Sequence, residues 1–432
     1  MKPQSMIDNG QRPETAALFG ARDEWRRGSK VVASAHIGMA TGAGLYLYLS
    51  SLFLVPLTEQ FGWSRGDAAS SGALGLLGAL TAPYIGKLAD RFGTKPVVVV
   101  CTVLMAMAFT LMSQISGSLA QFILFSALFG LVAPGCSGFA YSKAVASWFS
   151  KGRGQALGVM SAGSSIGVLL FAPIVAWAID DYGFMWGYLV LAGLPIIIGL
   201  PAVVYGLNDN NNSSYERERA QSALIDNKLL APETSETARV EQHSVGKVIA
   251  SPAFIVLAFA VFALNAPGAG VLTQLDPILE QNGINSPGFA ISMFAAAVLV
   301  GRIGIGWLFD RLDARYVAAF FVVVGGIGCL MLMANITLWL TFLAVILLGL
   351  LQGMETDVIG YFVGRHFSQD QFGVLSGTLF AISMLGTGVG IIGFGQLYDA
   401  TQSYDMALAS AAGFLAVSMI AFLRMPKHSR WA

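Results

Sequence analysis

The stretch Gly-Lys-Leu-Ala-Asp-Arg-Phe-Gly-Thr-Lys at residues 86–95 recurs in altered form at residues 306–315, as Gly-Trp-Leu-Phe-Asp-Arg-Leu-Asp-Ala-Arg. The two Asp-Arg pairs are 220 residues apart. A second match, between Trp-Phe-Ser at residues 148–150 and His-Phe-Ser at residues 366–368, has an offset of 218. Because two separate stretches recur at nearly the same offset, we infer that the chain consists of two related halves.

The repeated stretches lie in a strongly apolar chain. Of its 432 residues, 55% are hydrophobic and 12% are charged, and glycine contributes 50 residues. A soluble enzyme or a disordered chain needs more polar surface than this, and the net charge of zero argues against nucleic-acid binding. The composition therefore predicts an integral membrane protein with closely packed helices.

Apolar runs on both sides of the repeats are long enough to cross a bilayer as helices. Period-two alternation is absent, which argues against a transmembrane barrel. We expect an all-α membrane protein with twelve transmembrane helices in two six-helix pseudo-repeats. The expected spans are 31–57, 67–88, 96–114, 119–147, 154–179, 184–206, 252–275, 288–309, 316–335, 338–363, 373–398 and 405–425. The expected units are a tail 1–30, a bundle 31–207, a linker 208–250, a bundle 251–425 and a tail 426–432.

Positive charges lie almost entirely on one side of these spans. With both termini and the linker in the cytoplasm, 23 Lys and Arg residues are cytoplasmic, and Arg65 alone is on the opposite side. The net charge is then +8 on the cytoplasmic side, −7 on the opposite side and −1 within the membrane. The positive-inside rule therefore predicts a multi-pass protein with both termini cytoplasmic. We expect it in the cell inner membrane.

The stretch at 86–95 resembles the loop signature of the major facilitator superfamily, whose members are secondary transporters. The resemblance covers residues 31–425 and implies the major facilitator fold, with a central substrate site between two halves. It also implies a charged conformational latch in these loops. The residues assigned to the latch are Gly86, Asp90, Arg91 and Lys95 and, in the second copy, Asp310 and Arg311. Gly86 would permit close helix approach, and Asp90 would suit a helix N-terminus.

A narrower resemblance is carried by the stretches 61–65, 148–154, 301–302 and 353–357, which read FGWSR, WFSKGRG, GR and GMETD. These are similar to the bacterial monocarboxylate transporters and their oxalate/formate antiporter relatives. That resemblance implies transport of an organic anion, often by symport with protons. The first span lacks the lysine of animal monocarboxylate transporters, and the eleventh lacks the lysine of oxalate exchangers.

One cation, Arg302, falls inside an expected span. It precedes Asp310 by eight residues, which places it about 12 Å into the membrane. A guanidinium at that depth needs an anion. The first interpretation is a bidentate contact with a substrate carboxylate, which the family resemblance favours. The alternative is an internal ion pair with an acid on a neighbouring helix.

Two acids, Glu355 and Asp357, fall inside the tenth span. Because they are two residues apart on a helix, they point to different faces, and at most one easily shares a cavity with Arg302. A carboxylate between burial and a cation could bind and release a proton during transport. We therefore expect proton coupling through Glu355 or Asp357. In the alternative, one acid permanently neutralises Arg302 and the other bonds a neighbouring helix.

Polar side chains in spans expected to line the cavity are weaker candidates, for which helix packing is a competing explanation. The substrate-binding candidates besides Arg302 are Tyr46, Tyr48, Tyr141, Asn265, Gln274 and Gln352, and His36, Ser137 and Tyr361 are weaker still.

These observations predict a secondary active transporter that moves a small organic anion, specifically a monocarboxylate, by alternating access. The alternative is efflux of an amphipathic or aromatic compound by the same fold. No GxxxxGK[ST] run is present, and the four histidines form no catalytic set, so we expect no enzyme, no catalytic residue and no cofactor. The three cysteines are far apart in apolar runs, so we expect neither a disulfide framework nor a metal site. The expected partners are the anion, protons and the lipid bilayer, and we expect a functional monomer.

Overall fold

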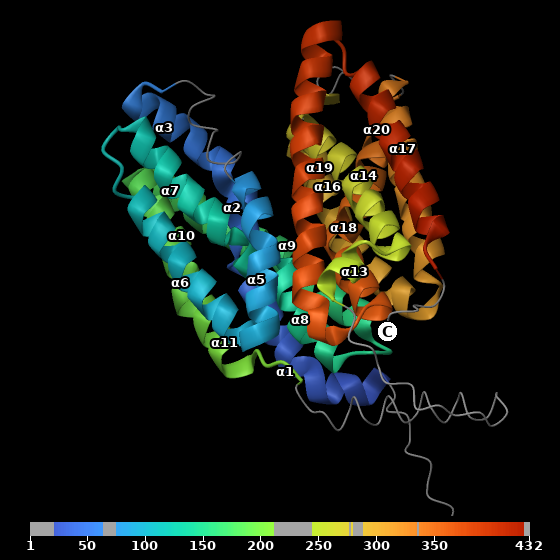
Figure 1. The fold of residues 1–432 in the computed structure, drawn as a ribbon. Coiled ribbons are helices and arrows are strands. Elements are labelled where there is room, and N and C mark those ends of the chain that lie inside the picture. Colours follow the sequence, from blue (N-terminus) through green and yellow to red (C-terminus); the bar gives the residue numbers. More distant parts are fainter. Residues whose placement is uncertain are drawn as a thin grey trace, which may run out of the picture.

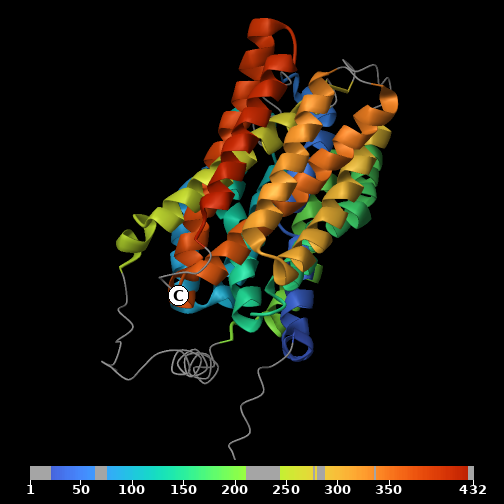
Figure 2. The same cartoon turned by 90° about the vertical axis from the view of Figure 1, so that its right-hand side faces the viewer.

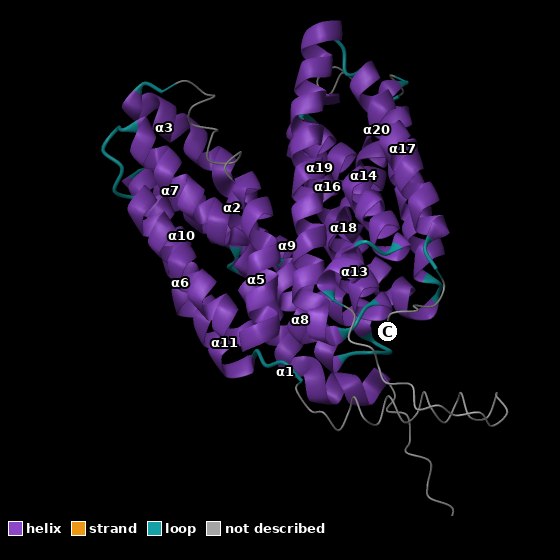
Figure 3. Ribbon diagram, in the orientation of Figure 1, coloured by secondary structure: helices purple, strands orange, loops and turns teal. Residues whose placement is uncertain are grey.

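The computed structural model describes residues 21–63, 75–210, 244–275, 278–279, 288–334 and 337–426. Within these ranges every regular element is a helix (Figure 3). Ten stretches of helix in these ranges are long and apolar enough to cross a membrane. The expected linker lies mostly outside the described residues, as do the first twenty residues and the last six.

The N-terminal half contributes fourteen described helical segments. They are α1 (Ala21–Ala40), α2 (Ala43–Leu49), η1 (Ser50–Phe53), α3 (Leu54–Phe61), η2 (Gly75–Leu77), α5 (Gly78–Phe92), α6 (Thr94–Met112), α7 (Leu119–Val132), η3 (Ala133–Cys136), α8 (Gly138–Trp148), α9 (Arg153–Tyr182), α10 (Phe184–Leu194), η4 (Pro195–Gly199) and α11 (Leu200–Gly206).

The C-terminal half contributes eight described segments. They are α13 (Val245–Ile249), α14 (Pro252–Thr273), α16 (Gly288–Arg311), α17 (Ala314–Met333), α18 (Leu338–His366), η5 (Gln369–Gln371), α19 (Phe372–Thr401) and α20 (Asp405–Arg424).

The two halves form two bundles that lie side by side (Figure 1). We call the end at which α1 begins and α20 finishes the terminal end, and the opposite end the far end. The ribbons of the two bundles approach each other toward the terminal end and diverge toward the far end. In the view turned by 90°, the long helices of both bundles run along one common direction (Figure 2). Together with the ten apolar helices, this arrangement confirms the expected all-α membrane fold.

Two expected spans of the N-terminal bundle are divided in the structure. The span expected at 31–57 is interrupted at Gly42, whose backbone is extended (φ −82°, ψ −169°). The span expected at 119–147 is interrupted at Ser137 (φ −115°, ψ 171°), after a turn that contains Pro134. Proline removes a helical N–H and glycine tolerates a break, so both interruptions have a local cause. The interruptions meet, because a Cβ at Gly42 would contact the carbonyl oxygen of Cys136.

Large apolar side chains cover the outside of both bundles. Leu169, Ile197, Tyr205 and Trp339 are among the exposed ones. In water such a surface would be an aggregation site, whereas lipid tails solvate it without cost. The cores are filled by other apolar side chains and by glycines that bring backbones together. This distribution is what the composition predicts for a protein that spans a membrane.

Candidate functional site

Arg302 of α16 crosses from the C-terminal bundle to the N-terminal bundle. Its side chain is buried, with 6% of its surface exposed. Nη1 donates to the backbone oxygen of Ser161 (2.7 Å), to Oγ of Ser164 and to Oγ of Ser165 (3.2 Å). All three acceptors lie on α9. Small residues make this crossing possible, because Gly158 of α9 packs directly on the backbone of Arg302.

Asp357 of α18 lies in the same junction and is 2% exposed. Its Oδ2 accepts a hydrogen bond from the hydroxyl of Ser161 (2.9 Å). The ion pairs within the described ranges are Lys143–Asp90 and Arg315–Asp313, so Arg302 and Asp357 form no direct pair there. Ser161 instead joins them, with its carbonyl on Arg302 and its hydroxyl on Asp357.

The structure separates the two acids of α18. Glu355 is half-buried and accepts a hydrogen bond from the amide of Gln352, one turn earlier on the same helix. Asp357 bonds across the junction to α9. The two carboxylates therefore face different surroundings, as their spacing on a helix requires. Of the two, Asp357 is the one that shares a bonding partner with Arg302.

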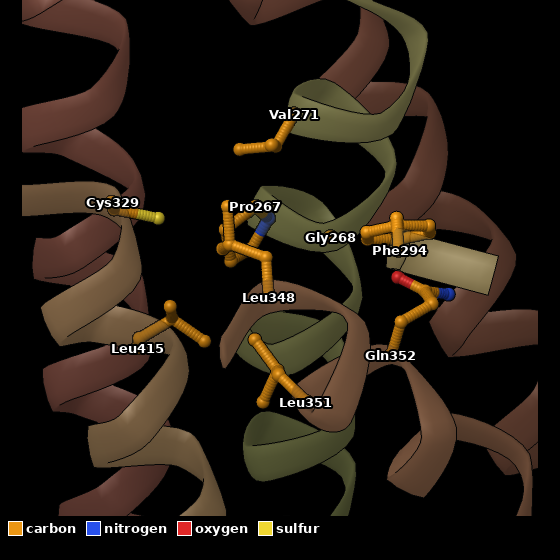
Figure 4. A pocket seen from close by; sticks show the side chains of 9 residues that line it. All are labelled: Pro267, Gly268, Val271, Phe294, Cys329, Leu348, Leu351, Gln352 and Leu415. Atoms are coloured by element: carbon orange, nitrogen blue, oxygen red, sulfur yellow. The ribbon is translucent and has the colours of Figure 1, made fainter. Parts of the chain in front are cut away.

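Gln352 also lies at the edge of a small cavity inside the C-terminal bundle (Figure 4). Apolar residues of α14, α16, α17, α18 and α20 form most of its wall, and Gln352 supplies a polar side chain to the lining. The cavity holds about 10 Å³, the space of a single water molecule. It is therefore too small for an organic substrate in this conformation.

The tyrosines proposed for the N-terminal bundle lie away from Arg302. Tyr46 is buried in an aromatic cluster, with its ring centroid 4.9 Å from that of Phe129 and 5.1 Å from that of Phe109. Tyr141 of α8 is buried with its hydroxyl against Gly38 of α1. Tyr48 is exposed. The structure does not bring these three side chains together with Arg302.

The two proposed amides of α14 bond within the C-terminal bundle. Nδ2 of Asn265 donates to the carbonyl of Val261 one turn earlier (2.8 Å). Oε1 of Gln274 accepts from the hydroxyl of Tyr404 (3.0 Å), next to the start of α20. These contacts stabilise α14 and its packing. Neither amide contacts Arg302 in this conformation.

The first repeated loop binds the opposite bundle through Asp90. Its two carboxylate oxygens accept from the backbone N–H groups of Gly373 (2.8 Å) and Val374 (2.8 Å), at the start of α19. Gly86 makes this possible, because its backbone packs directly on that of Gly373 and neither residue has a Cβ. Asp90 therefore occupies a helix N-terminus, where the helix dipole favours an anion.

The second repeated loop has the same geometry, with the aspartate on the C-terminal bundle and the helix N-terminus on the N-terminal bundle. The oxygens of Asp310 accept from the N–H groups of Gly154 (2.7 Å) and Gln155 (2.8 Å), at the start of α9. Gly306 packs on Gly154, as Gly86 packs on Gly373. Each bundle therefore presents one aspartate to a helix N-terminus of the other, and the two contacts hold the bundles together at the terminal end.

The basic residues of these loops contact their own bundles. The guanidinium of Arg91 lies over the ring of Phe92 at 5.1 Å, and that of Arg311 lies over the ring of Trp307 at 3.7 Å. Nζ of Lys95 donates to the carbonyl of Val204 near the end of α11 (3.0 Å). Of the residues of these two loops that the structure describes, the aspartates and glycines therefore make the contacts with the opposite bundle.

Sequence reasoning missed two charged residues that bond beside these cross-bundle contacts. Lys143 of α8 forms an ion pair with Asp90 (2.9 Å) and donates to the carbonyl of Ala89 (2.6 Å). Glu24 of α1 is buried and accepts from the N–H groups of Lys151 (3.1 Å) and Gly152 (3.0 Å), just before α9. Their charges are visible in the sequence, but each lies more than fifty residues from its partner.

The sequence profile of the Major Facilitator Superfamily matches residues 35–287, which is more than half of the chain. The uncharacterized MFS-type transporter YcxA of Bacillus subtilis is 21% identical and covers 88% of this chain and 91% of its own. Monocarboxylate transporter 12 of the mouse is 24% identical over 68% of this chain and 65% of its own. The fujikurins efflux protein of Gibberella fujikuroi is 24% identical over 69% of this chain and 56% of its own.

Solved structures show the same fold. The human organic anion transporter MFSD10 (TETRAN) aligns with 92% of this chain and 99% of its own, at a TM-score of 0.69 and 15% identity. The transporter FucP in its outward conformation aligns with 92% of this chain and 98% of its own, at a TM-score of 0.66 and 14% identity. From the matching profile, the repeated aspartate contacts and the shared fold, we conclude that the chain belongs to the Major Facilitator Superfamily.

Proposed function

We propose that this transporter moves a small organic anion, specifically a monocarboxylate, across the cell inner membrane. The observation that carries the proposal is that one edge of the Arg302 guanidinium has no hydrogen-bond partner among the described residues. Within the described residues all its hydrogen bonds leave from Nη1, and its buried Nε has no partner. The N–H groups of Nε and Nη2 form one edge of the guanidinium, which can donate two parallel hydrogen bonds to the two oxygens of a carboxylate.

The place of Arg302 supports alternating access around it. The residue lies in the junction of the two bundles, on the far side of the Asp310 contact. The terminal end is held by both aspartates, and the ribbons diverge toward the far end (Figure 1). With the terminal end in the cytoplasm, as the Lys and Arg distribution predicts, an anion would approach Arg302 from the opposite side. The names of two similar proteins, an organic anion transporter and a monocarboxylate transporter, agree with this class of substrate.

A proton on Asp357 would balance the charge of the bound anion. Arg302 and ionised Asp357 together carry no net charge in the buried junction. An entering carboxylate would leave one negative charge there, and an uncompensated charge in the membrane is costly. Proton uptake by Asp357 removes it, which makes symport with protons the mode we propose. Glu355 is the other acid considered for this role.

Transport into reconstituted vesicles tests the proposal. Radiolabelled monocarboxylates would be screened with and without an imposed pH gradient, using the wild type, Arg302→Leu and Arg302→Lys. We expect both variants to insert and to lose transport at least about 100-fold, because neither provides the bidentate edge. Arg424→Leu, which removes an exposed arginine at the end of α20, is the matched control. Undiminished uptake by Arg302→Leu would contradict the site.

Efflux of an amphipathic or aromatic compound is the second candidate. The similarity to the fujikurins efflux protein and the aromatic cluster around Tyr46 favour it. The same vesicles distinguish the two functions. Equal transport of an aromatic cation or neutral compound by Arg302→Leu and by the wild type would support efflux. It would also show that the substrate does not need a carboxylate group.

A further inference from the structure

Ser161 belongs to the N-terminal bundle and bonds both buried charges, Arg302 and Asp357. It lies on α9, two turns beyond the Asp310 contact, and its surface is 0% exposed. Its backbone oxygen accepts from Arg302 (2.7 Å) and its hydroxyl donates to Asp357 (2.9 Å). Both polar groups of one small residue are therefore used across the interface between bundles.

The hydroxyl of Ser161 has a choice of acceptor. Its single hydrogen faces Oδ2 of Asp357 at 2.9 Å and the carbonyl oxygen of Gly158, on its own helix, at 3.2 Å. A carboxylate accepts a charge-assisted bond that is about twice as strong as one to a neutral group. The contact from α9 to α18 is therefore strongest when Asp357 is ionised. When Asp357 is neutral, the carbonyl of Gly158 competes on nearly equal terms.

Arg302 is the charged group that acts most directly on Asp357. On α18 itself, Glu355 is bonded to Gln352. On α8, Lys143 is paired with Asp90, and Tyr141 lies against Gly38. The charged residues of α9, α17 and α19 lie in their end turns, and α14 has none: Arg153, Asp180 and Asp181 of α9, Arg315 of α17 and Asp399 of α19.

We infer that Ser161 couples the protonation of Asp357 to the separation of the two bundles, an inference that rests on the proposed proton-coupled transport. A proton from water binds Oδ1 of Asp357, which has no hydrogen-bond partner among the described residues. The carboxylate becomes neutral, and the bond from Ser161 loses its charge assistance. Arg302 loses its counter-charge at the same step and becomes available to the anion. The junction is then held by fewer strong contacts and opens more easily.

Distance measurements between the bundles test the inference. Spin labels would be attached at Gln60→Cys, at the far end of α3, and at Met406→Cys, near the start of α20, where both side chains are exposed. The native cysteines in the described residues are buried and offer little competition for labelling. The labels report two populations of molecules, one with the far ends of the bundles close together and one with them farther apart. In the wild type, we expect the ratio of these two populations to change about tenfold between about pH 8 and about pH 5.5.

Two serine variants of one helix separate coupling from packing. Ser161→Ala keeps the backbone contact to Arg302 and removes the bond to Asp357, so its ratio should change less than about twofold with pH. Ser164→Ala removes a bond to Arg302 and leaves Asp357 untouched, so its ratio should follow the wild type with pH. Asp357→Asn, which resembles the neutral acid, should hold the ratio at its low-pH value. A wild-type pH response in Ser161→Ala would overturn the inference.

Anion binding by the same samples distinguishes the inference from the proposed function. At about pH 5.5, where Asp357 is expected to be protonated in both proteins, Ser161→Ala should bind a transported monocarboxylate with a Kd within about threefold of that of the wild type. If Arg302→Leu also binds and transports normally while the wild-type separation still follows pH, the proposed anion site fails and the coupling stands. If the wild-type separation does not respond to pH while transport depends on Arg302, the coupling fails and the anion site stands.

Discussion

The cross-bundle contacts of Asp90 and Asp310, which we name the first and the second latch, have the same backbone geometry and different electrostatics. In the first, the charge of Asp90 is paired with Lys143. In the second, the residue 218 positions after Lys143 is Tyr361, whose hydroxyl donates to the carbonyl of Phe309 (2.6 Å). Lys143 makes the matching bond to the carbonyl of Ala89 (2.6 Å). The two halves therefore share a side chain at this position that bonds the carbonyl just before the aspartate. In the first half that side chain is a cation, Lys143, and in the second it is the neutral Tyr361.

The second latch also carries an additional anion. Glu24 accepts from the two N–H groups just before α9, and Asp310 accepts from those of Gly154 and Gln155 in the first turn of α9. Two charges act on Asp310 with opposite signs, the negative charge of Glu24 and the positive charge of Arg153. One helix N-terminus therefore holds two carboxylates, whereas the start of α19 holds one that is neutralised. The two copies therefore share the aspartate and the glycines that allow the backbones to meet. They differ in the neighbouring charged side chains, which set the strength of the contact.

We expect the largest effect on the latches from Asp90→Asn. The substitution keeps an acceptor for the start of α19 but leaves Lys143 half-buried without its anion. Removing one partner of such a pair should destabilise the closed terminal end by about 2 kcal/mol, or roughly 30-fold. Labels at Gln60→Cys and Met406→Cys would report the shift in bundle separation. Adding Lys143→Met should restore part of the loss, and an unchanged distribution in Asp90→Asn would contradict this account of the first latch.

The second latch should respond differently to neutralisation. Glu24→Gln and Asp310→Asn each remove one of two carboxylates that repel each other, so each single change should cost only about 1 kcal/mol. The double variant should cost more than the sum of the single variants, by about 0.5 kcal/mol, because each carboxylate contributes more when the other is absent. A double-mutant cycle on the same label pair measures this coupling. A sum equal to the double effect would show that the two anions act independently.

A smaller effect is expected where each repeated loop passes into its next helix. In the first copy, the N–H of Thr94 donates to the distant Asp209 (2.6 Å). In the second copy, Asp313 caps α17 itself and accepts from the backbone N–H of Arg315 (3.1 Å). Hydrogen bonds from the Arg315 side chain also lower the pKa of the Asp313 carboxyl below its ordinary value of 3.8. Asp313→Ala should therefore lower the stability of the detergent-solubilised protein by about 0.5 kcal/mol at neutral pH.

The pH dependence of that loss has a definite sign. Because folding lowers the pKa of Asp313, the ionised carboxylate stabilises the fold above the unfolded pKa, and the contribution disappears as the pH falls through the lowered value. The difference in melting temperature between the wild type and Asp313→Ala should thus persist at neutral pH and shrink only in strong acid. Asp313→Asn, which retains a capping oxygen, is the control. A difference that grew on acidification would contradict the assignment.

Particular residues show how far the sequence could predict this molecule. The spacing of Asp90 and Asp310 predicted the duplication, and the lengths of the apolar runs predicted the membrane helices. The breaks at Gly42 and Ser137 were not predicted, because hydropathy is insensitive to a short turn inside an apolar run. Arg302, Glu355 and Asp357 could be selected by charge alone. Lys143, Glu24 and Ser161 could not, because nothing in the local sequence indicates which distant helix each one contacts.

The sequence by itself determined the all-helical membrane class, the twofold repeat and the small set of charges that must lie in an apolar environment. These are properties of composition and period, and they depend on water and lipid rather than on neighbouring helices. Only the tertiary structure decided that Asp90 and Asp310 bind helix N-termini in opposite bundles, and that Ser161 stands between Arg302 and Asp357. The physical reason is that a hydrogen bond depends on distances of a few ångströms between residues that are well over a hundred positions apart, and packing alone sets those distances.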